Sequence, residues 1–284
     1  MKTIPVFFTP QMVADSRSYS PSAAKPKQVV ASWQALGLPL EVHAPAAVSV
    51  EQLSLAHDAD FVRGVLEGRL QNGFGNRSPE VAASLPFTSG AMCAAARHAP
   101  VLPGVAVAPC SGFHHARWKQ PAGFCTFNGL MVTAATLRAE GARRIGILDC
   151  DHHEGDGTDA IIGHLGASSW VRHFTAGKHF HRPRDAEAFF AWLPGVLDAL
   201  SDCDVVLYQA GADPHRDDPL GGWLTTRQLH ERDEVVFQSL AARAVPVAWN
   251  LAGGYQQQPD GSIPKVLEIH DNTLRACAAR YVTR

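Results

Sequence analysis

The sequence predicts an α/β fold, specifically a three-layer α/β/α sandwich with a mainly parallel, doubly wound sheet. Compact apolar runs, most of them rich in Val, Ile or Leu, alternate with longer stretches of helical periodicity. Runs that are apolar throughout are typical of parallel strands buried on both faces. Repeated strand–helix–strand order implies right-handed crossovers, with helices on both faces of the sheet. In such folds ligands bind beyond the carboxyl ends of the strands, so the active site is expected there.

The expected elements follow from this alternation. The strands are predicted at Thr3–Phe8, Gly104–Ala108, Arg144–Asp149, Ser169–Phe174, Asp204–Gln209 and Pro246–Leu251. The helices are predicted at Ala23–Leu36, Ser89–His98, Asn128–Glu140, Asp185–Leu200, Thr226–Ala242 and Pro264–Ala279. A proline at the first position of the last helix suits a helix N-terminus. We expect residues 1–284 to form a single domain, which is long enough to bury a large core.

Composition argues against several classes of protein. The 284 residues are 46% hydrophobic and 18% charged, which is ordinary for a soluble enzyme and unlike a disordered chain. A net charge of −2 argues against a nucleic-acid partner, and no polybasic run indicates a membrane surface. The N-terminal apolar run is broken by Pro5 and Pro10, so it is too short for a signal sequence or a membrane span. We expect a cytoplasmic protein, with its oligomeric state left open and a homo-oligomer as one option.

The six cysteines are scattered singly, without a Cys-x-x-Cys pair, and most lie in apolar segments. They are therefore expected to be buried, reduced thiols.

Polar clusters follow four of the expected strands. His114 and His115 come after the strand that ends near residue 108, and an Asp- and His-rich segment follows Leu148. Asp213 and the Gly-Gly-Tyr sequence that ends at Tyr255 follow two later strands. Because the carboxyl ends of parallel strands meet at one edge of a sheet, these clusters are expected to form one site.

The segment after Leu148 is predicted to hold a metal ion. If the extended conformation persists past Leu148, Asp149, Asp151 and His153 share one face, because side chains alternate along a strand. Asp213 is expected to join Asp151 and His153, and two carboxylates with one imidazole leave an open coordination position, as a catalytic site needs.

The metal and one ligand have alternatives. Zinc is the default for hydrolysis, but the oxygen-rich ligand set also suits Fe(II), Co(II) or Mn(II). His215 and His173 are rivals of Asp213 as the third ligand.

The adjacent histidines His114 and His115 are predicted to be an acid–base pair. Asp149 and Asp156 could each accept an imidazole N–H, which fixes the tautomer and raises basicity. Two neighbouring imidazoles repel when both are protonated, so their pKa values should separate. Such a pair suits taking a proton from water and delivering one to a leaving amine.

Two Gly-containing loops carry aromatic side chains toward the expected site. Tyr255 follows Gly253 and Gly254, where its phenol could donate a hydrogen bond to a carbonyl oxygen that gains negative charge. Gly123 and Phe124 could form an apolar wall for an acyl arm. Ordinary core or rim packing is the alternative explanation for both aromatic residues.

Together these motifs resemble the histone deacetylase and acetylpolyamine amidohydrolase superfamily, on the arginase–deacetylase fold. The matching segments are Gly112–Ala116, Gly123–Asn128, Asp149–Thr158, Gly211–Gly221 and Gly253–Tyr255, with a weaker match at Ala56–Val62.

The resemblance implies a zinc-dependent deacetylase that hydrolyses the amide of an acetyl-lysine or acetylpolyamine. It implies metal ligation by Asp151, His153 and Asp213, and an acid–base pair, His114 and His115, backed by Asp149 and Asp156. It further implies that Tyr255 polarises the scissile carbonyl and that Gly123, Phe124, Gly253 and Gly254 line the substrate site. A structural potassium ion beside the catalytic metal is also implied, at Asp149, Asp151 and His153.

The chain departs from the family pattern in three places. Glu154 stands where the family usually has a second histidine, and His152 replaces an apolar or tyrosyl residue. The segment Gln71–Glu80 has no clear counterpart of the acidic residue with which many protein deacetylases hold the substrate backbone. A histone-like substrate is therefore disfavoured relative to a small acetylated amine or an exposed acyl-lysine.

Two other functions are compatible with parts of the pattern. A ureohydrolase on the same fold would hold two manganese ions, with further Asp and His ligands where this chain has His114, His115 and Tyr255. A non-catalytic acyl-amine binding module would normally have lost a ligand or an acid–base group, and none is lost here.

Overall fold

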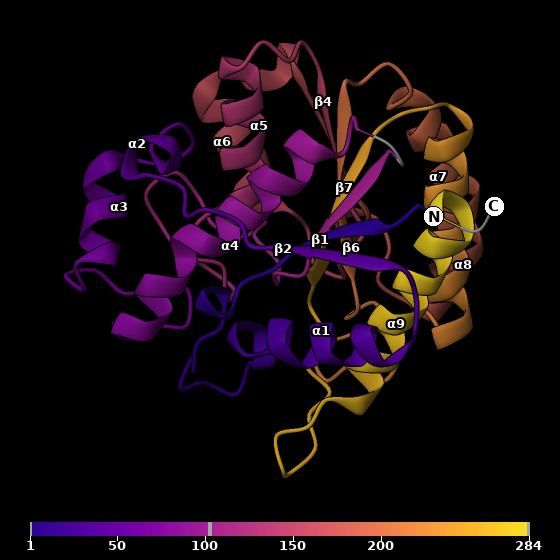
Figure 1. The fold of residues 1–284 in the computed structure, drawn as a ribbon, viewed down its shortest axis with the longest axis horizontal. Helices are drawn as coiled ribbons and strands as arrows, with labels where there is room; N and C mark the ends of the chain where they lie inside the picture. The colour runs from indigo at the N-terminus through magenta and orange to yellow at the C-terminus, as the bar shows by residue number, and fades with distance from the viewer. Residues whose placement is uncertain (1, 102–103, 283–284) are drawn as a thin grey trace.

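The computed structural model describes residues 2–101 and 104–282, and a seven-stranded sheet lies at its centre (Figure 1). The strand order is β2-β1-β3-β7-β6-β4-β5, and all the strand pairs are parallel. The strands are β1 (Ile4–Phe7), β2 (Leu40–His43), β3 (Val105–Ala108), β4 (Ile145–Asp149), β5 (Val171–Thr175), β6 (Val205–Gly211) and β7 (Val247–Ala252). This architecture confirms the predicted three-layer α/β/α fold.

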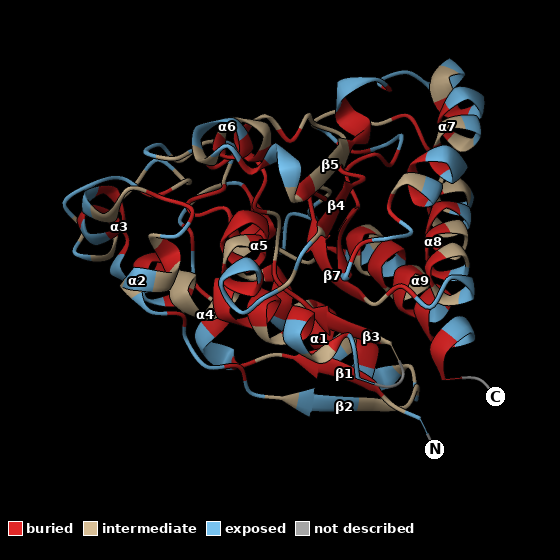
Figure 2. Ribbon diagram, turned by 90° about the horizontal axis from the view of Figure 1, so that it is seen from above, coloured by how far each residue is buried: buried red, intermediate tan, exposed pale blue. Residues whose placement is uncertain are grey.

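Helices cover both faces of the sheet. The α-helices are α1 (Lys25–Ala35), α2 (Val50–Leu53), α3 (Ala59–Leu66), α4 (Pro79–His98), α5 (Gly129–Ala139), α6 (Asp156–Leu165), α7 (Ala186–Ala199), α8 (Thr226–Ala242) and α9 (Pro264–Tyr281). Short 3-10 helices occur at Pro10–Met12, Pro21–Ala23, Ala167–Ser169, Ala176–Lys178 and Pro183–Asp185. The buried sheet lies between layers of helices whose outer surfaces are exposed (Figure 2).

Each face of the sheet has its own hydrophobic core. Helices α1, α7, α8 and α9 pack on one face, and α2 to α6 pack on the other. The alternation of side chains along a strand divides β3 between the two cores: Val105 and Val107 enter one, and Ala106 and Ala108 enter the other. Both faces of the central strands are therefore apolar, which explains their uninterrupted apolar sequence runs.

The sequence predicted most elements within a few residues and missed others. The strand β2 was missed because it is a half-exposed edge strand, Leu40–His43, without an apolar run. Helix α4 begins at Pro79 rather than Ser89, because Ser78 caps it and Pro86 is tolerated inside it. Helices α2, α3 and α6 were also missed, and α6 begins within the Gly-containing motif, where no helix was predicted.

The strand order places the four polar clusters side by side. The clusters follow β3, β7, β6 and β4, which are consecutive neighbours in the sheet. All four strands are parallel, so their carboxyl ends lie at the same edge. The topology thus brings together segments that are far apart in the sequence, as the sequence predicted.

All six cysteines are free and buried, as expected. Among residues 2–101 and 104–282, no helix combines the length and the apolar character needed to cross a bilayer.

Trp33, which with Trp249 is one of the two largest fully buried side chains of the described residues, provides a test of the core. Its ring centroid lies 5.4 Å from that of Trp249, and its indole N–H donates to the carbonyl of His270. Trp33→Ala is expected to lower the free energy of unfolding by about 3–5 kcal/mol, because it leaves a cavity and an unpaired carbonyl. Urea unfolding measures this change. Tyr19→Ala, at a position where the side chain is 65% exposed, is the control and should cost less than about 0.5 kcal/mol.

Candidate active site

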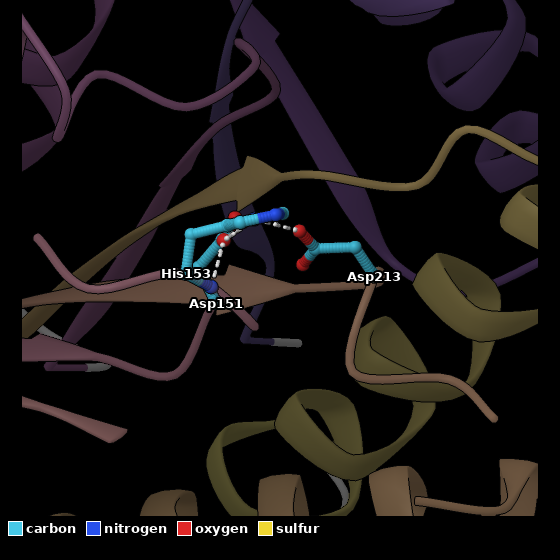
Figure 3. A group of neighbouring side chains, drawn as sticks. All are labelled: Asp151, His153 and Asp213. Carbon is cyan, nitrogen blue, oxygen red and sulfur yellow. Dashed lines mark hydrogen bonds and ion pairs between the residues drawn. The ribbon is translucent and has the colours of Figure 1, made fainter. Parts of the chain in front are cut away.

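Asp151, His153 and Asp213 converge beyond the ends of β4 and β6 (Figure 3). The Nδ1 atom of His153 lies 3.2 Å from Oδ1 of Asp151 and 3.1 Å from Oδ2 of Asp213. The three candidate ligand atoms lie within 4.8 Å of one another. Both carboxylates are buried, and the imidazole is half-buried. This is a donor set of two oxygens and one nitrogen, all facing one point.

The backbone around Asp151 explains why alternate side chains point inward. Strand β4 ends at Asp149, so the predicted extension past Leu148 does not continue to His153. Instead, the N–H of Asp151 donates to the Asp149 carboxylate at 3.1 Å, and the N–H of His153 donates to the Asp151 carboxylate at 2.9 Å. These successive turns, each closed by an Asp side chain, curve the chain around the cluster. The predicted grouping was correct, but its cause is a pair of Asx turns rather than a strand.

The cluster is electrostatically suited to a cation. Hydrogen bonds that the imidazole donates to Asp151 and Asp213 raise the pKa of His153 to about 10, so an imidazolium balances the two carboxylates. Burial, together with the nearby Asp151, raises the pKa of Asp213 to about 7. Burial opposes ionisation of Asp151, but His114 and His153 outweigh it and lower that pKa. The residues therefore fit a divalent metal, which would take the place of the protons.

The two rival ligands lie outside this cluster. His215 contacts the Thr226 hydroxyl at 3.0 Å, and His173 contacts the Asp159 carboxylate at 2.7 Å. Among the described residues, Asp151, His153 and Asp213 form the single group of candidate metal-binding side chains.

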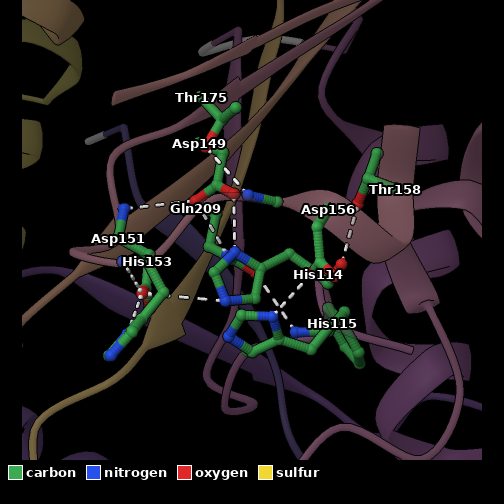
Figure 4. A network of polar contacts seen from close by, with 12 residues as sticks. His114, His115, Asp149, Asp151, His153, Asp156, Thr158, Thr175 and Gln209 are labelled. Carbon is green, nitrogen blue, oxygen red and sulfur yellow. Dashed lines mark hydrogen bonds and ion pairs between the residues drawn. The ribbon is translucent and has the colours of Figure 1, made fainter. Parts of the chain in front are cut away.

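His114 and His115 lie beside the cluster, each paired with the aspartate that was predicted for it (Figure 4). Nδ1 of His114 lies 2.7 Å from Asp149, and Nδ1 of His115 lies 2.8 Å from Asp156. The two ring centroids are 4.1 Å apart. If each Nδ1–H donates to its carboxylate, each Nε2 is left to exchange protons.

The two imidazoles differ in protonation. Burial disfavours a charge on His114, but Asp149, Asp151 and Asp213 outweigh burial and raise its pKa to about 9. Burial and the charge of His114 lower the pKa of His115. The predicted separation of the pair is therefore present: His115 is neutral near pH 7, whereas His114 is protonated.

Side chains that the sequence analysis did not identify hold this pair in place. Gln209 donates to Asp149 at 2.9 Å and accepts the backbone N–H of Phe113 at 3.2 Å. Arg117 donates to the Asp156 carboxylate. Gln209 is a polar residue within the otherwise apolar strand β6, and this position is the signal that could have identified it.

Two fully buried cations stabilise the loops behind the cluster. The Lys25 ammonium donates to the carbonyl of Gly253, and burial lowers its pKa to about 8 although Asp213 and Asp151 oppose this shift. Arg232 donates to the carbonyls of Cys150 at 3.1 Å and Gly211 at 2.7 Å. Each cation therefore holds a loop next to the buried carboxylates. No local sequence pattern indicates either role.

The glycines before Tyr255 permit its approach. Gly253 and Gly254 have φ values of +51° and +85°, and a Cβ on Gly253 would lie 2.1 Å from the Asp213 carboxyl carbon. The N–H of Tyr255 donates to Asp218 at 2.8 Å. Burial, followed by the nearby Asp213 and Asp151, raises the pKa of the Tyr255 phenol well above its ordinary value. The phenol thus remains a neutral hydrogen-bond donor.

A narrow cavity lies among these groups, and Gly123, Phe124, Gly253 and Tyr255 line it with His114 and Asp151. Gly123 allows a close contact, because a Cβ there would lie 2.4 Å from the His115 ring. Three of the four predicted substrate-site residues therefore line the cavity, and Gly254 packs against Val266 and Ala212 instead.

Two of the three departures from the family pattern, the side chains of Glu154 and His152, lie outside the metal cluster. The Glu154 side chain pairs with Lys178 at 3.2 Å. The His152 ring lies against Gly221 and near His181, and its backbone N–H donates to Asp213 at 3.2 Å. Both side chains line an open basin of about 760 Å³ that His115 and His153 also border.

Comparison with known proteins agrees with this geometry. The histone deacetylase domain profile matches residues 21–181, more than half of the chain. An uncharacterized protein of Picosynechococcus sp. is 29% identical over 241 residues, which cover 76% of this chain and 79% of that protein. The acetoin utilization protein AcuC of Bacillus subtilis is 26% identical over 263 residues, which cover 75% of this chain and 66% of AcuC.

Solved structures show the same fold. The acetylpolyamine aminohydrolase of Burkholderia pseudomallei superposes with a TM-score of 0.75 at 19% identity, covering 98% of this chain and 99% of the other. The HD domain of HDA15 superposes with a TM-score of 0.77 at 19% identity, covering 99% and 91%. The chain belongs to the histone deacetylase domain family, and it is a hydrolase that acts on amide bonds.

The protonated cluster predicts that metal binding depends on pH. A ligand imidazole must be neutral, and His153 has a pKa of about 10 without metal, so Zn²⁺ should displace about one proton at pH 8. Below pH 7 the number of protons that Zn²⁺ displaces should approach about two, because Asp213 is then protonated as well. The apparent affinity therefore falls as pH falls, by about tenfold per unit for each proton. Titration calorimetry in buffers of different ionisation enthalpy counts these protons.

Two variants serve as the test and the control in this calorimetric titration. Asp213→Asn should abolish tight binding, whereas His173→Gln, which removes a rival ligand, should retain both the affinity and the proton count. Binding that is independent of pH contradicts the ligand assignment, and so does loss of binding in the His173 variant alone.

Proposed function

We propose that the protein is a metal-dependent deacylase that hydrolyses N-acylated amines, with Zn²⁺ as the expected ion and Fe²⁺ or another divalent ion as the alternative. The observation that carries this proposal is the proximity of a cation-binding cluster, a carboxylate-backed histidine pair and a phenol, of which Asp151, His114 and Tyr255 line one cavity. A structural potassium ion at Asp149, Asp151 and His153 stays a prediction. We take the whole chain as one catalytic domain.

The reaction adds water across an amide. The C–N bond breaks, a C–O bond forms, and one proton of the water moves to the leaving nitrogen. A divalent ion held by Asp151, His153 and Asp213 would supply Lewis acidity to the carbonyl and lower the pKa of a bound water. The neutral phenol of Tyr255 donates a hydrogen bond to the carbonyl oxygen as that oxygen gains negative charge.

We propose that His115 transfers the proton from the attacking water to the leaving amine. Its lowered pKa leaves it neutral near pH 7, so its Nε2 can accept the water's proton and then deliver it to the amine. Asp156 orients the ring through Nδ1. His114 is more deeply buried, and its charge stabilises the carboxylates and the negative charge that develops on the oxygen.

The substrate is proposed to be an acetyl-lysine, an acetylpolyamine or another small acyl amine. Wild-type protein reconstituted with metal should release the acid from at least one of these classes. Urea release without acid release would favour a ureohydrolase instead, and metal binding with every substrate intact would favour a binding module.

Removing one hydroxyl tests the role of Tyr255. Tyr255→Phe is expected to lower kcat by roughly 10²–10³-fold, because one oxyanion donor is lost while the ring remains. Steady-state kinetics on the best acyl amine measures this. Tyr281→Phe is the control. Tyr281 is the last residue of α9, and its buried hydroxyl has no hydrogen-bond partner in the described structure. Unchanged turnover in the Tyr255 variant would remove the phenol from the mechanism.

The pH profile tests the role of Asp156. Asp156 raises the pKa of His115, so Asp156→Asn should lower that pKa and shift the acidic limb of kcat/KM to lower pH. The maximal kcat/KM should fall about 10–100-fold because the ring loses its orienting partner. Asp159→Asn, which removes the partner of His173, should leave the profile in place. An unshifted limb in Asp156→Asn argues against His115 as the base.

A further inference from the structure

The loop that carries Asp213 is a closed structure of its own. This loop, the Asp213 loop, comprises residues 213–224 and leads from β6 toward α8. The N–H groups of Trp223 and Leu224 donate to the carbonyl of Pro214 at 2.8 and 2.7 Å, so the two ends of the loop are joined. A loop with joined ends that packs on itself holds its shape better than an open connection.

Asp218 extends from this loop to the turn that carries Tyr255. Its side chain is buried, and the carboxylate accepts the N–H of Tyr255 at 2.8 Å and the N–H of Leu220 at 3.0 Å, one at each oxygen. Burial raises the pKa of Asp218 to about 6, so the group is a carboxylate at pH 8 and both hydrogen bonds are charge-assisted. One oxygen therefore braces the Asp213 loop, and the other holds the Tyr255 turn.

The Tyr255 turn needs such a contact, because its own backbone is permissive. Gly253 and Gly254, which precede Tyr255, have φ values of +51° and +85°, and glycine loses more conformational freedom on folding than any other residue. After Gln256, residues 257–260 are exposed, and this segment extends away from the rest of the molecule before α9 begins (Figure 1). Tyr255 thus lies between two glycines and an exposed loop.

A second contact from the same loop supports the first. The side-chain nitrogen of Gln256 lies 2.9 Å from Nδ1 of His215, and Nε2 of His215 lies 3.0 Å from the Thr226 hydroxyl. If the Gln256 amide donates to Nδ1, the ring is the Nε2–H tautomer and donates to Thr226. The buried imidazole then links the residue after Tyr255 to the start of α8. His215, a rival metal ligand by sequence, therefore has a different partner.

The position of the phenol relative to the metal cluster is thus set largely by one loop. Asp213 belongs to the cluster, and Asp218, five residues later, holds the N–H of Tyr255. A hydrogen bond to a developing oxyanion depends on accurate placement of the donor, and a misplacement of about 1 Å can cost roughly 100-fold in rate. We infer that Asp218 is a positioning residue that holds the Tyr255 phenol in place to donate to the substrate's carbonyl oxygen. The inference rests on the proposed function.

Substitution of Asp218 tests this in metal-reconstituted enzyme at pH 8. Asp218→Ala should lower kcat about 10–100-fold and change KM by less than about twofold, because the phenol is misplaced while ground-state binding remains. Asp218→Asn keeps one acceptor oxygen, so its kcat should lie between those of Asp218→Ala and the wild type. Asp217→Ala removes the neighbouring carboxylate, which is 72% exposed, and as the matched control should keep the wild-type kcat.

A double-mutant cycle with Tyr255→Phe separates positioning from a general structural effect. In the Tyr255→Phe background, Asp218→Ala should lower kcat by less than about threefold, because no hydroxyl is left to position. Asp218→Asn replaces Asp218→Ala in the cycle if the alanine variant does not fold. Losses that multiply in the double variant would overturn the role of Asp218 but leave the proposed function standing. A wild-type enzyme without hydrolase activity would overturn the proposed function itself.

Binding measurements give a readout that does not depend on turnover. A trifluoromethyl ketone analogue of acyl-lysine, whose hydrate resembles the tetrahedral intermediate, should lose affinity in Asp218→Ala by about the same factor as kcat. The affinity for Zn²⁺, measured by calorimetry, should equal that of the wild type. Weaker Zn²⁺ binding in Asp218→Ala, with unchanged affinity for the ketone once the metal is saturating, would contradict positioning of the phenol.

Discussion

The repulsion between two buried carboxylates, Asp151 and Asp213, is the constraint on which the rest of the site depends. Both approach the same imidazole nitrogen of His153 to just over 3 Å, in a place that water barely reaches. Charges of one sign cannot remain this close in a poorly solvated environment without positive charge between them. In the metal-free protein, the protons on His153 and Asp213 offset the repulsion between the carboxylates. A bound divalent ion would offset it more completely.

The surrounding structure reduces this repulsion through dipoles and buried cations. Backbone N–H groups of His152 and His153 point at the two carboxylates, and His114 adds a charge from the side. Lys25 adds a buried positive charge near Asp213 and Asp151 while it donates to the carbonyl of Gly253. Arg232, which is paired with Asp233, holds the loop carbonyls of Cys150 and Gly211. These loop contacts of Lys25 and Arg232 go to backbone carbonyls and not to the Asp151 or Asp213 carboxylates.

The sequence predicted those elements whose apolar pattern directly reflects burial in the core. The central strands were predictable because both of their faces are apolar, and the convergence of the site followed from parallel topology alone. The positions of Asp149, Asp151 and His153 were grouped correctly, although Asx turns replace the assumed extended chain. Edge strand β2 was not predictable, since half-exposed residues carry no apolar run. Gln209, Lys25 and Arg232 became recognisable only in three dimensions, because their partners are distant in sequence.

The contact between Lys25 and Gly253 joins residues separated by 228 positions, so it spans most of the polypeptide. The Tyr255 turn that Gly253 begins comes from the last strand of the sheet, and β7 inserts between strands β3 and β6, which precede it in the sequence. Contacts of such long range form slowly in folding, because chain entropy must be lost before they stabilise the fold. Tyr255 therefore reaches the metal cluster only when β7 has taken its place between β3 and β6.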